Sequence, residues 1–138
     1  MHSYNHGLVT SAKGAAIQCA VVTNLDITPA ADAECDVDDF ASNFVDTVIT
    51  AATGIYDVQL KQPYPASLTC VPSISLATAT TDLIHARYVD GSYDPEEGTF
   101  QVVLVNDDDS GAGVAVAGGA ANELTLLMFC QRYTSLLP

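Results

Sequence analysis

With 138 residues, 49% hydrophobic and 15% charged, the chain is expected to fold as one domain, or one domain with an arm, and its composition excludes a disordered polypeptide. Seventeen acidic and four basic residues give a net charge of −13, which either keeps the protein soluble or fits a basic surface on a partner. Because this charge repels a phosphate backbone and no apolar run approaches the ~20 residues of a membrane-spanning helix, we expect neither nucleic-acid nor membrane binding.

Residues 1–42 differ in composition from the rest of the chain. They are rich in Ala, Thr, Ser, Asn and Asp, and contain one short apolar run, Ala15–Val22. A stretch around Pro29 breaks any continuous element. The segment is either an extended arm that ends in a strand and lies across a neighbouring subunit, or an edge strand and a loop of the same domain. We therefore divide the chain into an N-terminal arm or edge segment, 1–42, and a β-domain, 43–138.

The β-domain is expected to contain short strands with one buried face. Tyr56, Val58 and Leu60 alternate with Asp57 and other polar residues, which is the period of a half-buried strand. The strands expected on this pattern are Phe44–Thr50, Gly54–Leu60, Ser67–Ile74, Leu83–Val89, Thr99–Val105 and Asn122–Arg132.

An all-β fold is favoured, since no stretch of the chain has the period of an amphipathic helix. Pro72 is typical of an edge strand or a bulge, because proline donates no hydrogen bond to a neighbouring strand. The polar turn 90–98 is expected to join a hairpin, and 106–121 to form a loop. We predict a compact antiparallel β-sandwich or a small β-barrel, of the β-tulip or jelly-roll kind, with an extended N-terminal arm.

Two acidic turns are similar to fragments of calcium-binding loops. Asp107 and Asp109 belong to a D-x-D-x-G fragment, and Asp90 and Asp94 flank Ser92 in a second one. A full calcium loop needs a bidentate glutamate at its end, and no acid lies at that distance from Asp107. Aspartate and glycine are also the residues of ordinary turns. We assign no metal site and no cofactor, and these four aspartates remain candidate calcium ligands.

The sequence carries no pattern for catalysis or for a zinc site. Its four cysteines contain no C-x-x-C pair, and Cys70 and Cys130 are expected to be small buried hydrophobes. His85 is expected on the exposed face of a strand, and no nucleophile turn of the type G-x-S-x-G is present. We predict no catalytic residues and no enzyme activity.

Five residues are candidates for contact with a partner protein. Tyr64 lies between two prolines, and Tyr93 lies in the polar turn. Tyr4, Ile17 and Val21 belong to the segment that would lie across a neighbour. Tyrosine suits such a contact because it combines a large apolar ring with a polar hydroxyl.

The run Thr53-Gly-Ile-Tyr-Asp-Val-Gln-Leu-Lys-Gln-Pro-Tyr64 resembles a pattern of tailed-phage capsid decoration proteins, T-G-x-Y-x-V-x-L-x-x-P-Y. The similarity extends over Phe44–Tyr133 and includes Gly98–Val102 and the closing run Leu124–Phe129. It implies a non-enzymatic virion protein, made in the host cytoplasm, that sits on the capsid surface as a homotrimer and bridges major capsid protein subunits. The apolar end Thr134–Pro138 departs from the polar, basic tails of such proteins, so it is open which end faces the shell.

Two other functions are compatible with the sequence. The chain is alternatively a tail- or fibre-associated phage β-domain that attaches to a tube or to host glycans, or a secreted β-domain whose acidic loops bind calcium. The position of the protein on the particle distinguishes the first. A calcium-dependent shift in melting temperature and a location outside the cytoplasm distinguish the second.

Overall fold

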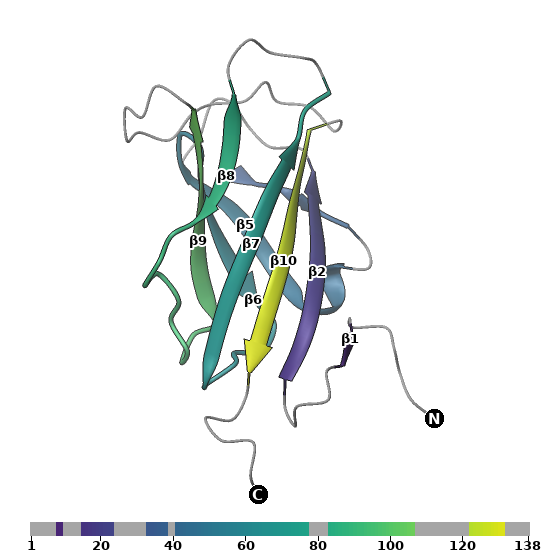
Figure 1. The fold of residues 1–138 in the computed structure, drawn as a ribbon, viewed down its shortest axis with the longest axis vertical. Helices are drawn as coiled ribbons and strands as arrows, with labels where there is room; N and C mark the ends of the chain where they lie inside the picture. Colours follow the sequence, from purple (N-terminus) through teal and green to yellow (C-terminus); the bar gives the residue numbers. More distant parts are fainter. Residues whose placement is uncertain are drawn as a thin grey trace, which may run out of the picture.

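The computed structural model describes residues 8–9, 15–23, 33–38, 41–77, 83–106 and 122–131, which form two antiparallel β-sheets packed into a sandwich (Figure 1). The strands are β1 (Leu8–Val9), β2 (Ala15–Thr23), β3 (Ala33–Glu34), β4 (Asp36–Val37), β5 (Val45–Ala52), β6 (Ile55–Leu60), β7 (Ser67–Ser75), β8 (Ile84–Tyr88), β9 (Thr99–Asn106) and β10 (Glu123–Gln131). The helical part of the described chain is a single 3-10 turn, η1 (Ala41–Asn43), so no helix there is able to cross a membrane.

One sheet has the strand order β1-β2-β10-β7, with β4 paired to β2, and the other has the order β3-β5-β6-β9-β8. In Figure 1, β2, β10 and β7 lie side by side, and β5 and β6 cross behind them. β10 lies inside the first sheet, because it pairs with β2 from Leu124 to Gln131 and with β7 from Glu123 to Gln131. In the described part of the chain the two sheets stay separate, so the sandwich is the correct one of the two predicted architectures.

The core lies between the sheets and is built from alternate residues of their strands. Tyr56, Val58 and Leu60 of β6 are all buried, which confirms the predicted inward face of this strand. β9 and β10 contribute in the same way, with Phe100, Val102 and Leu104 from the first and Leu124, Leu126, Met128 and Cys130 from the second. Burial of each large apolar side chain contributes about 1.5–3 kcal/mol of favourable transfer free energy, so this period-two pattern is what holds the sheets together.

All six strands predicted for the β-domain are present, with ends that differ by no more than two residues from those expected. β8 pairs with β9 across the turn 90–98, as predicted for a hairpin. Among the described strands, β7, which contains Pro72, has β10 as its one neighbour and forms the edge of its sheet, as its proline indicated.

The described residues of the segment 1–42 contribute strands to both sheets. β2 pairs with β10, β4 pairs with β2, and β3 pairs with β5. Ala20 and Val22 of β2 are fully buried, and Cys35 is also in the core. These residues therefore match the alternative of strands within the same domain. On the side of β2 away from β10, the two-residue strands β1 and β4 pair with its two ends. Residues 1–7, 10–14, 24–32 and 39–40 lie outside the described residues.

Candidate interaction surface

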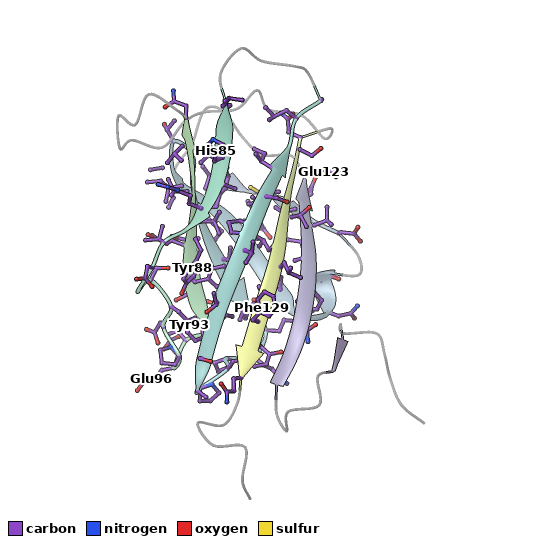
Figure 2. The ribbon with its side chains drawn as sticks, viewed as in Figure 1. His85, Tyr88, Tyr93, Glu96, Glu123 and Phe129 are labelled. Carbon is purple, nitrogen blue, oxygen red and sulfur yellow. The ribbon has the colours of Figure 1, made fainter. Side chains whose placement is uncertain are left out.

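The outer surface of β2, β10 and β7 carries apolar side chains and hydroxyl groups in place of charges; we call it the β10 face. Phe129 and Val71 are 43% and 54% exposed there, and Leu127 and Val21 are half-buried. The register places Leu127 opposite Val71 and Phe129 opposite Thr69, so these side chains are neighbours across two strands. Figure 2 shows Phe129 on β10, in the layer that faces the viewer.

Charge is almost absent from the three strands that form the β10 face. Glu123, at the first position of β10, is the one charged residue in β2, β10 and β7. The exposed positions of β7 are otherwise Ser67, Thr69, Ser73 and Ser75. The other acidic side chains of the described chain belong to other strands and to turns: Glu34, Asp36, Asp38, Asp46, Asp57, Asp90, Asp94, Glu96 and Glu97.

The exposed apolar residues of the described chain concentrate on this face. Of the three large hydrophobic side chains that are clearly exposed, Phe129 and Val71 lie on it, and Leu83 lies just before β8. Single exposed hydrophobic residues are normal, but neighbouring ones on an uncharged sheet favour contact with another protein. Burying this face removes water from methyl groups and hydroxyls, which costs much less than removing it from carboxylates.

Tyr64 and Tyr93, two of the predicted partner residues, are joined to each other. The Tyr93 hydroxyl donates a hydrogen bond to the Tyr64 carbonyl oxygen (2.8 Å) and accepts one from the Tyr64 N–H (2.7 Å). Both residues pack partly buried against the core, and burial is the main cause that raises the pKa of Tyr93 above its usual range. The Tyr93 hydroxyl thus ties the turn 90–98 to the segment between β6 and β7.

The remaining partner candidates have different positions. Val21 is half-buried on β2 and belongs to the β10 face. Ile17 is paired in register with Phe129, and its side chain lies outside the part of the molecule that is described. Tyr4 also lies outside it.

Two of the four calcium candidates, Asp90 and Asp94, lie in the described turn between β8 and β9. One oxygen of the Asp94 carboxylate accepts hydrogen bonds from the N–H groups of Glu96 (2.8 Å) and Glu97 (3.1 Å), which is the usual role of aspartate in a turn. Among the described residues, no group of three or more His, Cys, Asp or Glu side chains is arranged to hold a metal ion. Asp107 and Asp109 fall outside those residues.

Cys70 and Cys130 face the core from the neighbouring strands β7 and β10. Both are buried free thiols, as is Cys35, which confirms the prediction of small buried hydrophobes for the first two. Burial raises the pKa of each to about 12, and for Cys70 the neighbouring Cys130 adds to this effect. A thiol that stays protonated is a poor nucleophile and a poor metal ligand, so these groups serve packing.

A second surface feature, on the other sheet, was assigned no role from the sequence. A depression of about 360 Å³ is lined by Asp57, Ser92, Thr99, Phe100 and Gln101. Asp57 was expected on the polar side of its strand, which is correct, but the alternation along a strand does not reveal its partner. That partner is Gln101, 44 residues away, whose Nε2 donates to Asp57 Oδ1 at 2.7 Å.

No model of a known protein family matches this chain, and comparisons with curated proteins and with solved structures found no match either. The resemblance to phage decoration proteins therefore stays a prediction, and a proposal about function has to rest on the surface of the protein.

Proposed function

We propose that this chain is a non-enzymatic virion protein that decorates and stabilises a phage capsid by bridging neighbouring major capsid subunits. The observation that supports the proposal is the β10 face, a partly apolar sheet surface with Glu123 as its one charged residue, on a protein whose net charge is −13. Three parts of this proposal come from the sequence resemblance: the phage origin, the position on the capsid surface and the homotrimer.

The distribution of charge favours docking through the β10 face. Carboxylates lose strong hydration when they are buried, so a contact through the other, acid-bearing surfaces requires a matching cation for each of them. The β10 face avoids this cost except at Glu123, its one charged residue. The acids that remain exposed would keep decorated particles apart in solution, since surfaces of equal charge repel one another.

Charge complementarity also indicates which kind of capsid surface would fit the β10 face. Asp36 is paired in register with Thr23 of β2, and Glu123 begins β10 beside this same end of the sheet. The partner is therefore an apolar patch on the outside of a major capsid subunit, with basic residues where it meets Glu123 and Asp36. Many identical copies on a symmetric shell strengthen the whole layer even when each contact is weak.

Immunogold electron microscopy of phage particles from the source culture, with antibody against this chain, tests the proposal. Gold spread evenly over the heads is the expected result. Gold confined to the tails would contradict the proposal in favour of a tail-associated domain. Unlabelled particles, with antibody that still recognises the purified chain, would exclude a virion protein.

A further inference from the structure

The depression lies on the outer surface of the sheet β3-β5-β6-β9-β8, on the side of the sandwich away from the β10 face. Asp57 comes from β6, Thr99, Phe100 and Gln101 come from β9, and Ser92 comes from the turn after β8. The site therefore combines two neighbouring strands with the turn beside them. Its volume of about 360 Å³ is that of a small ligand site.

The polar groups of the depression are held in place before any ligand binds. Asp57 and Gln101 are directly opposite in register, and Gln101 Nε2 donates to Asp57 Oδ1 at 2.7 Å. The backbone N–H of Gln101 donates to Ser92 Oγ at 2.9 Å, which fixes the turn against the strand. Because these bonds orient the carboxylate and the carboxamide, little conformational entropy is lost when a ligand contacts them.

Binding capacity is left over after these internal bonds. Within the described residues, Asp57 Oδ2 and the side-chain oxygen Oε1 of Gln101 accept no hydrogen bond, and Gln101 Nε2 has a second hydrogen to donate. The Thr99 side chain adds a hydroxyl, which both donates and accepts. The site thus presents acceptors and donors a few ångströms apart.

The charge of the lining decides which ligands fit. Asp57 is its one ionised residue, no cation accompanies it, and the chain carries a net charge of −13, so anions are repelled. A single carboxylate with a few neutral oxygens is also too few ligands for calcium, which takes about six to eight. A neutral ligand with adjacent hydroxyl groups satisfies both the acceptors and the donors.

We propose that this depression binds a terminal sugar residue of a neutral glycan. One sugar hydroxyl donates to Asp57 Oδ2, and the adjacent hydroxyl accepts from Gln101 Nε2. The lining offers no exposed aromatic ring for the sugar to stack on, since Phe100 is 1% exposed, so affinity for a single sugar is weak, with a Kd of about 1 mM or above. This inference does not rest on the proposed capsid function.

The test is a titration of the isotope-labelled full chain, followed by amide NMR shifts. Methyl glycosides of glucose, galactose and mannose are added separately, each to about 50 mM so that a Kd in the millimolar range is measurable. The expected result is saturable shifts for at least one glycoside, centred on the amides of Asp57, Ser92, Thr99 and Gln101.

Two matched variants locate the site. Asp57→Asn keeps the size of the side chain but removes its charge, and is expected to weaken binding about tenfold, because hydrogen bonds to an ionised acceptor are the stronger ones. Asp46→Asn, which removes an exposed carboxylate from β5 of the same sheet, is expected to bind as the wild type does.

Three results would overturn the inference. The first is the absence of saturable shifts with all three glycosides, and the second is equal affinity in Asp57→Asn and the wild type. The third is a calcium titration that shifts the same amides while the sugars do not, which would assign the depression to a cation.

Discussion

At the scale of single residues, the Tyr93 hydroxyl joins two segments that lie about 30 positions apart in the chain. Its two hydrogen bonds engage both main-chain groups of Tyr64, which sits between two prolines in the segment between β6 and β7. Tyr93→Phe leaves these groups to water, and we expect it to lower the free energy of unfolding by about 1–3 kcal/mol. Urea unfolding measures the loss. Glu96→Gln, an exposed change in the same turn, is the control, and equal midpoints for the two variants would contradict the role given to the hydroxyl.

The buried thiols give a residue-scale prediction about pH. Burial raises the pKa of Cys70 and Cys130 from 9.0 to about 12, so between these values the unfolded chain loses thiol protons that the folded chain keeps. The folded state then binds more protons, and stability falls as the pH rises through this window, while the full contribution is present below it. Unfolding midpoints measured across the window should therefore decrease. The double variant Cys70→Ala, Cys130→Ala should show a smaller decrease, and an identical slope would contradict the assignment.

At the scale of the elements, substitutions at two glycines in the β8–β9 turn distinguish the cost of backbone strain from the cost of a close contact. Gly91 and Gly98 have φ angles of 75° and 74°, which side chains of other residues rarely adopt. A Cβ at Gly91 meets nothing within 4 Å, whereas at Gly98 it lies 3.1 Å from Pro63 Cα. Both changes to alanine should cost about 1–2 kcal/mol from the φ angle, and Gly98→Ala about 1 kcal/mol more from the contact. Thermal unfolding compares the two variants. A larger destabilisation by Gly91→Ala than by Gly98→Ala would show that the chain at Pro63 moves aside at no cost.

The elements themselves were largely predictable from the sequence, and their partners were not. Alternation identified the strands and their inward faces, because burial on one side imposes a period of two on every strand. Pro72 indicated the edge position of β7 for a chemical reason that applies in any sheet. The pairing of β2 with β10 was not predicted, because alternation reports a face and says nothing about which strands are neighbours.

The candidate surfaces were less predictable than the fold. The β10 face combines β7 and β10, which are more than 45 residues apart, so its lack of charge becomes visible only when the strands are paired. The pair Asp57–Gln101 and the contact between Tyr64 and Tyr93 likewise join residues that are far apart in the sequence and meet only in the folded chain. Alternation placed Asp57 on the polar face of its strand, but which residue it meets there is a property of the topology.

At the scale of the whole molecule, the two sheets present different surfaces to the solvent. One is partly apolar and carries charge only at Glu123 and Asp36 among its described residues, and the other carries the Asp57–Gln101 depression together with the exposed His85 and Arg87 of β8. His85, at one end of β8, is labelled in Figure 2. A protein that sits on a shell needs one surface for the shell and leaves the other in solvent. The sandwich supplies this division, because each sheet has one outer side.

The measurement that tests the central claim most directly is co-sedimentation of the purified chain with phage heads that lack it, comparing Phe129→Glu with Leu83→Glu. Each variant replaces an exposed large hydrophobic residue by the same charge, but only Phe129 lies on the β10 face. We expect Phe129→Glu to weaken binding at least about tenfold, because it buries an unpaired carboxylate, and Leu83→Glu to bind as the wild type does. Equal binding by the two variants, with both shown to be folded, would contradict docking through the β10 face.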